Sequence, residues 1–399
     1  YGHTIVLKEG APYQAGDRVT FEGSEYLIVD NDTIRSAIAS GDCDNLITSK
    51  VTDMSGLFAG EERNDSTVSC DVTGWDTSNV TNMSRLFQYA SSFNQDISSW
   101  DVSNVSNMSG MFEDARAFNA DISNWNTAKL TDMSGMFNWA SKFNQDISGW
   151  DISKVTTLNM TFVAAHTFNR DLSNWDTSSV TNMKETFYEA HSFNGDVSTW
   201  DVSKVTDMSA MFKNALAFEQ DLSQWNISNV TLIGSMFSNA VKFNSDISSW
   251  DTSNVIYMAG MFSSAEKFNS DISQWNTSKV HNMDYLFAGT KSFKADISQW
   301  DTSNVTDMSM MFFESNFNGN IGNWDTSKVT QMRSMFFGAT SFNQDISRWD
   351  TSSVDVMEYM FKDARSLKID LKGWDVSSVT RHNSFNEGAE GVIPPIWVH

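Results

Sequence analysis

The sequence predicts an α/β solenoid of about 13–14 stacked units, because one pattern of 25 residues recurs along most of the 399-residue chain. Tryptophan occupies positions 75, 100, 125, 150, 175, 200, 225, 250, 275, 300, 324, 349 and 374, so that a single interval is one residue shorter than the rest. A fixed period of this length is the signature of repeat proteins, in which each unit packs against its neighbours. A hydrophobic content of 40% is enough for a continuous core.

Each unit is predicted to hold a helix and a short strand. After Trp75, apolar residues recur at the spacing of one face of a helix of about three turns. They are Val80, Met83, Leu86, Phe87 and Ala90. The Asp, Thr and Ser that follow the tryptophan are residue types that cap helix N-termini, and residues 96–98 suit a brief strand.

Stacking such units combines two different spacings. Parallel strands lie about 4.8 Å apart, whereas packed helices need roughly 8–10 Å between their axes. The mismatch predicts a curved solenoid with the helices outside, unless the helices tilt to absorb it. Trp75, Trp100 and Trp125 represent one of the apolar columns that would form the core.

Two acidic columns accompany the tryptophans. The residue four before Trp is Asp in twelve of thirteen units, as in Asp96, Asp121 and Asp146, and the residue after Trp is Asp in ten units and Asn in three. Repeated carboxylates could bind a row of calcium ions, which take about six to eight oxygen ligands, or they could cap helices and turns. Free exchange of Asp for Asn favours capping, because Asn keeps the acceptor but loses the charge. No cofactor is therefore predicted, with calcium as the alternative.

The chain is expected to have three regions: a β-rich cap in residues 1–45, the array in residues 46–385 and a capping tail in residues 386–399. The expected elements of the cap are strands at Thr4–Leu7, Arg18–Phe21 and Glu25–Val29 and a short helix at 31–39. A solenoid needs such atypical ends because an uncapped coil exposes core and strand edges. The apolar tail either covers the last coil or leads into a further region.

The two cysteines, Cys43 and Cys70, lie near the start of the array. A disulfide between them would hold the open end of the solenoid together and contribute about 3 kcal/mol to the free energy of unfolding. It would also be consistent with an oxidising compartment. The alternative is a pair of buried, unpaired thiols.

The charge of the chain excludes several classes of partner. A net charge of −23 argues against nucleic acid, which requires a basic surface, and against anionic membranes. No apolar run approaches the roughly 20 residues of a transmembrane helix. Because the chain starts at Tyr1 rather than Met, we interpret it as a processed or trimmed form, from which a targeting or anchoring segment can be missing.

The sequence predicts no enzyme. It has no Gly-rich phosphate loop, no HExxH motif, no nucleophile elbow and no metal-ligand spacing of Cys and His. His166 and His191 lie one repeat apart and could share a metal ion, but variable surface positions are the expectation, and no metal site is predicted.

Binding residues are expected where the repeat varies. Eight aromatic residues on the flank of the predicted helices are the candidates: Tyr89, Trp139, Tyr188, Tyr257, Tyr285, Phe313, Phe337 and Tyr359. Such side chains can anchor an interface, or they can be scattered surface aromatics with partial burial. Glycosylation sequons at Asn79, Asn104, Asn229 and Asn304 arise from the repeat and matter only in a eukaryotic secretory pathway.

The unit W-D-T-S-N-V-T-N-M-S-x-x-F-x-x-A-x-x-F-N-x-D-I-S resembles the repeats of BspA-like leucine-rich-repeat surface proteins, and more closely a subgroup found in mycoplasma surface lipoproteins. The resemblance covers residues 46–385. It implies a leucine-rich-repeat-like solenoid, an extracellular or cell-surface location, and adhesion to host or matrix components.

Three functions are compatible with these observations. The first is adhesion or recognition of protein or glycan on a cell or matrix surface, through the variable positions. The second is a structural subunit of a surface layer, sheath or filament, which assembles end to end through residues 1–4 and 394–399. The third is a flat face that orders water or ice, built on Thr77, Thr252 and Thr277.

Overall fold

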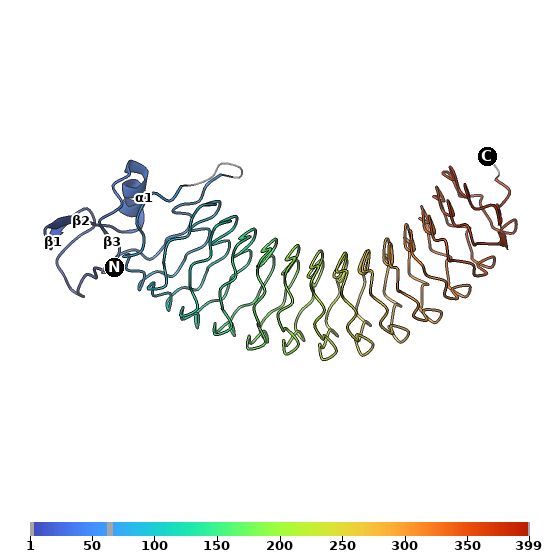
Figure 1. Ribbon diagram of the computed structural model, residues 1–399, viewed down its shortest axis with the longest axis horizontal. Coiled ribbons are helices and arrows are strands. Elements are labelled where there is room, and N and C mark those ends of the chain that lie inside the picture. Colours follow the sequence, from blue (N-terminus) through green and yellow to red (C-terminus); the bar gives the residue numbers. More distant parts are fainter. Residues whose placement is uncertain (1–3, 62–66, 398–399) are drawn as a thin grey trace. The chain divides into compact units, whose positions relative to one another are not determined.

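The computed structural model describes residues 4–61 and 67–397. The chain divides into two compact units, Tyr1–Val180 with Glu189–Asp196, and Thr181–Tyr188 with Val197–His399. Each unit contains a stack of similar coils, one coil per sequence repeat (Figure 1). The prediction of a repeat solenoid is therefore confirmed, while the region boundaries at residues 45 and 385 stay predictions.

Regular secondary structure is concentrated at the N-terminal end. Strand β1 (Arg18–Phe21) pairs antiparallel with β2 (Ser24–Ile28), and β2 pairs in parallel with β3 (Leu46–Ile47), so the small sheet continues into the start of the array. Helix α1 (Asn31–Ser40) begins after Asp30, whose carboxylate accepts the N–H of the third helical residue. The strand predicted at residues 4–7 is not formed.

Within the described part of the array, the segment predicted to be a helix is a run of tight turns. The N–H of Leu86 donates to the carbonyl of Met83 at 3.2 Å, and the N–H of Ala90 donates to that of Phe87 at 3.1 Å, three residues back in each case. The alternate N–H groups point to the next coil instead: Met83 donates to Asn107 at 2.9 Å. The helix prediction is wrong, because these groups bond between coils.

Two positions of the turn run in the regular units have left-handed backbone, which an α-helix does not contain. In the first regular unit they are Arg85, with φ of 56°, and Tyr89, with φ of 62°. Equivalent residues in other units share this conformation, among them Gly110, Gly135, Met160, Ala164, Gly289, Met310, Glu314 and Gly338.

The distance between coils explains the absence of helices. The ring centroids of Phe87 and Phe112 lie 5.8 Å apart, and those of Trp125 and Trp150 lie 6.0 Å apart. Helices side by side need roughly 8–10 Å, so coils this close cannot each contain one. The curvature predicted from a mismatch of helix and strand spacing loses its basis.

Parallel contacts between coils form at a different place from the predicted strand. Single-residue parallel bridges join Asn82 to Asn107 and Asn107 to Asp132, and they continue in the second unit. The predicted strand at residues 96–98 belongs instead to a turn, in which the N–H of Trp100 donates to the carbonyl of Ile97 at 3.1 Å.

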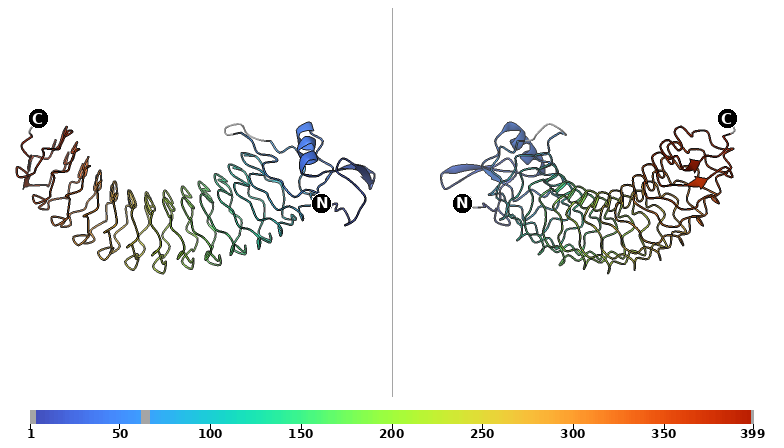
Figure 2. Two further views of the ribbon diagram at one scale, coloured as in Figure 1. Left: turned by 180° about the vertical axis from the view of Figure 1, so that it is seen from behind. Right: turned by 45° about the vertical axis from the view of Figure 1, so that its right-hand side comes forward.

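The C-terminal tail packs on the last coil. Strand β4 (Ile369–Asp370) pairs in parallel with β5 (Val392–Ile393) of the tail, as Figure 2 shows. The indole of Trp397 stacks on His382 at 4.0 Å between ring centroids and meets Phe385 edge-on at 5.1 Å.

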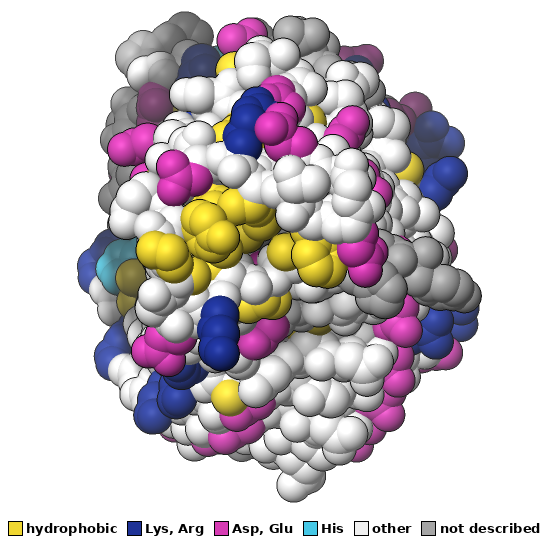
Figure 3. Space-filling model, turned by 90° about the vertical axis from the view of Figure 1, so that its left-hand side faces the viewer, with side chains coloured by type: hydrophobic (Ala, Val, Ile, Leu, Met, Phe, Trp, Pro, Cys, Tyr) yellow, Lys and Arg dark blue, Asp and Glu magenta, His cyan; other side chains and the backbone are white. Residues whose placement is uncertain are grey.

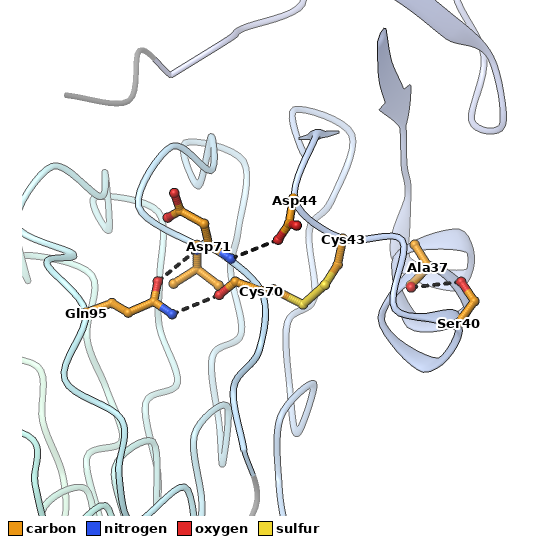
Figure 4. The surroundings of a disulfide bond; sticks show 8 residues. Ala37, Ser40, Cys43, Asp44, Cys70, Asp71 and Gln95 are labelled. Atoms are coloured by element: carbon orange, nitrogen blue, oxygen red, sulfur yellow. Dashed lines mark hydrogen bonds between the residues drawn. A yellow bond between two sulfur atoms is a disulfide. The ribbon is translucent and has the colours of Figure 1, made fainter. Parts of the chain in front are cut away.

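Cys43 and Cys70 form a disulfide with their Cα atoms 5.5 Å apart. It joins the loop after α1 to the segment before the first regular unit (Figure 4). Gln95 of the next coil donates to the carbonyl of Cys70 at 2.8 Å and accepts from the N–H of Val72 at 3.0 Å. The disulfide and the two hydrogen bonds of Gln95 thus hold the first coils together.

Buried columns run through each stack of coils. Trp75, Trp100 and Trp125 are 3–4% exposed, and the indole N–H of Trp100 donates to the carbonyl of Val72 at 3.1 Å. The threonine column is buried as well: Thr77 is 1% exposed and donates to the carbonyl of Asp101 at 2.9 Å. Thr252 and Thr277 are equally buried. A threonine face that orders water or ice is therefore wrong.

Candidate functional site

The outward side chains of the turn runs form one surface of the coils, called the turn face from here on. In the first regular unit these residues are Asn82, Ser84, Arg85, Gln88 and Tyr89, and in later units they are the residues at the same repeat positions. Their backbone groups are engaged within and between coils, while the residues between them, such as Met83 and Phe87, are fully buried. Side chains of the turn face can therefore vary without disturbing the core.

All eight candidate aromatic residues lie on the turn face. Three of them are exposed, Trp139 at 44%, Tyr257 at 42% and Tyr285 at 41%. The other five are half-buried: Tyr89, Tyr188, Phe313, Phe337 and Tyr359. Tyr89 and Trp139 belong to the first compact unit and the other six to the second.

Some of these aromatics are held by neighbours in the second unit. Phe313 and Phe337 stack with ring centroids 5.0 Å apart. The Tyr359 ring lies 5.9 Å from the guanidinium of Arg333 and 5.9 Å from the ammonium of Lys362, which is within the range of cation–π attraction. These contacts fix the orientation of the rings on the coil surface.

The Tyr257 ring lies against Gly234 of the preceding coil. A Cβ atom at position 234 would come within 2.4 Å of this ring. Glycine at this position thus lets the tyrosine lie flat on the turn face.

A half-buried carboxyl group, that of Asp284, precedes Tyr285 in the chain. Burial, and then the charge of Asp307, raise the pKa of Asp284 to about 7. Its Oδ1 atom has no hydrogen-bond partner among the described residues. Asp284 therefore keeps its proton to a higher pH than an ordinary aspartate does.

The turn face of the first unit contains a hollow of about 220 Å³ that the sequence analysis missed. Its floor is formed by Gly110 and Gly135, which occupy in two successive coils the position held by Arg85 on one side and Met160 on the other. The two glycines have no side chain, whereas Arg85 and Met160 on either side have long ones, and the hollow is the space between these two. The signal in the sequence is the motif M-S-G-M-F in consecutive units.

Polar side chains line this hollow. The Glu113 carboxylate accepts from the amide of Gln88 at 2.6 Å and from that of Asn138 at 3.1 Å. Asn138 is 7% exposed, and its Oδ1 atom has no partner among the described residues, which is also true of the Oδ1 atom of Asn159. No salt bridge of the described residues involves Arg85, the exposed cation at the rim.

The side chains of the two aspartate columns accept hydrogen bonds from the turns that follow them. Asp96 Oδ1 accepts from the N–H of Ser98 at 3.0 Å and from its hydroxyl at 2.6 Å, and these bonds, the hydroxyl first, lower the pKa of Asp96. Asn126 accepts in the same way from the N–H of Ala128 at 3.2 Å, which explains why Asn can replace Asp. Asp121 and Asp146 accept equivalent amide bonds at 2.9 and 3.0 Å. The described residues contain no group of three or more His, Cys, Asp or Glu that could hold a metal ion.

The two histidines that could share a metal ion stack on each other. The rings of His166 and His191 lie 4.7 Å apart, and Trp139 meets His166 edge-on at 5.9 Å. Burial, and then the neighbouring His191, lower the pKa of His166. Face-to-face rings do not converge their nitrogen atoms on a common point, as a metal ion requires.

The asparagines of the sequons are part of the stack. The Nδ2 atom of Asn79 donates to the carbonyl of Ser49 at 2.9 Å, and that of Asn104 donates to Ser78 at 2.7 Å. Asn229 and Asn304 make equivalent bonds at 2.7 and 2.8 Å. The nitrogen to which a glycan would be attached is therefore engaged between coils.

Four overlapping segments of the chain, residues 31–149, 140–247, 217–316 and 290–394, match a family described as "Mycoplasma protein of unknown function, DUF285". The chain belongs to this family. The DUF285 matches extend over nearly all of the array and confirm a repeat-protein family, whereas the subgroup inferred from the resemblance stays a prediction. No curated protein matches the chain.

Among solved structures, a leucine-rich repeat protein from Eubacterium ventriosum is similar, with 14% sequence identity and a TM-score of 0.38 over 89% of this chain and 85% of that protein. In residues 4–61 and 67–397 of the DUF285 chain, no helix is long and apolar enough to cross a membrane.

Proposed function

We propose that this DUF285 protein is a non-enzymatic recognition protein of the cell surface or extracellular space, and that it adheres to protein or glycan through its turn face. The observation that carries the proposal is the placement of exposed aromatics, above all Tyr257 and Tyr285, at outward positions of a scaffold whose backbone groups bond within and between coils. Its family of repeat proteins and its similarity to the repeats of BspA-like surface proteins support the location.

Exposed aromatics on a rigid scaffold favour binding for two reasons. A tyrosine or tryptophan ring buries a large area on contact and has few rotatable bonds. Because the coils already hold the backbone beneath Tyr257 and Tyr285, little conformational entropy is lost when a partner covers these rings.

The proposal includes no ion and no cofactor. The oxygens of the acidic columns accept hydrogen bonds from the amides of the turns.

Retention of the purified chain on arrays of glycans and matrix proteins tests the recognition function. Replacing both Tyr257 and Tyr285 by alanine should weaken retention by about tenfold or more, as the loss of interface anchors does. Tyr13→Ala is the matched control, because Tyr13 is equally exposed, at 41%, but lies in the N-terminal region. Equal losses in the control and the double variant would contradict the proposed role of the turn face.

A structural subunit is the second candidate, because apolar side chains are exposed near both chain ends. Val6 is 61% and Phe21 48% exposed at one end, and Ile396 is 72% exposed at the other. Figure 3 shows hydrophobic side chains gathered on the face at the N-terminal end. Of the predicted contact segments, residues 1–3 and 398–399 lie outside the described residues.

Light scattering across a range of concentrations separates the two candidates. The recognition proposal expects a stable monomer, because the tail already packs on the last coil through β5 and Trp397. Growth of filaments with increasing concentration would favour the structural subunit instead.

A further inference from the structure

We propose that the hollow in the turn face of the first unit binds one neutral sugar residue. This site rests on the proposed recognition function and specifies the chemical class of its ligand. The hollow lies wholly within the first compact unit, between Arg85 and Met160.

The size of the hollow limits the ligand to a single ring. Sites for drug-sized molecules have roughly 300–1,000 Å³, whereas this hollow has about 220 Å³. The space above Gly135 is open, because a Cβ atom added there would have no neighbour within 4 Å. At Gly110, in contrast, an added Cβ would meet Arg85 Cγ and Glu113 Oε2, each at 3.3 Å. A ligand therefore sits over Gly135, with Arg85 and Glu113 at its side.

The polar groups of the hollow require a ligand that both donates and accepts hydrogen bonds. The acceptor at this place is the Glu113 carboxylate, whose Oε2 atom lies 3.3 Å from the position that a Cβ atom would take at Gly110. A carboxylate only accepts, so the ligand must donate to it. The guanidinium of Arg85 has only donors to offer, so the ligand must also accept.

The serine hydroxyls add to this requirement. The hydroxyl of Ser109 donates to Asn107 at 2.8 Å, and that of Ser134 donates to Asp132 at 2.7 Å. Their oxygen atoms therefore remain acceptors in the lining of the hollow. Several hydroxyl groups on one ring, each a donor and an acceptor, match this arrangement, and a sugar residue presents them.

Charge decides between a neutral and an acidic sugar. The Glu113 carboxylate, itself held by Gln88 and Asn138, lies across Gly110 from Arg85, so the two charges at the site offset each other. The chain as a whole carries a net charge of −23, which opposes the approach of an anion. A neutral ring is therefore the better ligand.

Saturation-transfer NMR with glucose, galactose, mannose and N-acetylglucosamine, added one at a time as free sugars, tests the site. At least one of them should bind the wild-type chain, and Gly135→Met should weaken that binding by tenfold or more because its side chain fills the hollow. The fold tolerates methionine there, since Met160 and Met310 occupy the same turn position with φ of 58° and 52°. Arg85→Ala, a change at an exposed side chain, should weaken binding through loss of a donor.

Gly56→Met is the control for Gly135→Met. Gly56 holds the same turn position in the first, irregular coil with φ of 61°, and a Cβ atom there meets only Ala59 Cβ, at 3.8 Å. Sugar binding should not change in this variant. No binding of any of the four sugars at about 10 mM, tenfold above a millimolar dissociation constant, would overturn the proposal, as would equal binding by Gly135→Met and the wild type.

The outcomes also separate this site from the wider proposal. If the wild type is retained on a matrix protein through Tyr257 and Tyr285 but binds no sugar, the sugar site fails and the recognition function stands. If a sugar binds at Gly135 while the tyrosine variants lose no retention, the hollow stands and the tyrosine surface fails. Tighter binding of glucuronic acid than of glucose would contradict the choice of a neutral ring.

Discussion

A single departure from the repeat can change the chemistry of a position, as Asp284 shows. Serine stands at the same place in several units, for example Ser84, Ser109 and Ser134, where a hydroxyl is tolerated in a half-buried setting. Asp284 places a carboxyl group there, and burial with the nearby Asp307 raises its pKa to about 7. In its charged form this group destabilises the coil that contains it.

The stability of the second unit should therefore depend on pH through Asp284. With a pKa of 3.8 when unfolded and about 7 when folded, the folded state holds a proton that the unfolded state has released, so stability decreases as the pH rises from about 4 to 7. Asp284→Ser should stabilise the chain at pH 8 by roughly 1–3 kcal/mol, allowing for partial exposure, and change little at pH 3. Urea unfolding at both pH values measures the difference, and an equal effect at the two would contradict it.

At the scale of the coil, the sequence identified the inward residues but assigned the wrong element. Val80, Met83, Leu86, Phe87 and Ala90 are all fully buried, as expected. The same spacing of apolar residues suits an amphipathic helix and a run of turns, because both return to the core after three or four residues. Periodicity alone could not separate them.

The glycines of the repeat distinguish a run of turns from an amphipathic helix. Gly110 and Gly135, in the middle of the supposed helices, adopt φ of 61°, and a glycine inside a helix costs about 1 kcal/mol relative to alanine. Recurrent glycine at one repeat position is therefore better explained by a turn with left-handed backbone. The parallel ladder was also expected, but its position depends on which turns leave N–H groups free, and residue types do not show this.

The candidate site was predictable only in part, for a related reason. Aromatics such as Tyr257 and Tyr285 stand out as variations in the repeat, so their outward position could be expected from the sequence. The hollow over Gly110 and Gly135 arises from side chains that are absent in two adjacent coils, between the long side chains of Arg85 and Met160. Only the stacking of one coil on the next brings these features together.

At the scale of the whole molecule, stability in such a stack is carried by contacts between neighbouring coils. The coil that begins at Trp75 packs on an irregular coil, and the indole N–H of Trp75 has no partner among the described residues, whereas that of Trp100 donates to the preceding coil. The disulfide of Cys43 and Cys70 closes a loop with a sequence separation of 27. On the chain-entropy relation this is worth about 3.5 kcal/mol of stability, which adds to the contacts that hold this end of the array.

Reduction of this disulfide should therefore loosen the N-terminal coils and leave distant coils unchanged. Amide hydrogen exchange should show protection between residues 67 and 100 falling by up to a few hundredfold, which is about 3.5 kcal/mol. Protection around Trp300 should be retained, because its N–H groups bond within their own coil and to the adjacent one. The double variant Cys43→Ser with Cys70→Ser should show the same pattern without reductant and no further change with it. A uniform loss of protection along the chain would show that the coils unfold as one cooperative body, and unchanged protection at the N-terminal end would show that the hydrogen bonds of Gln95 suffice to hold it.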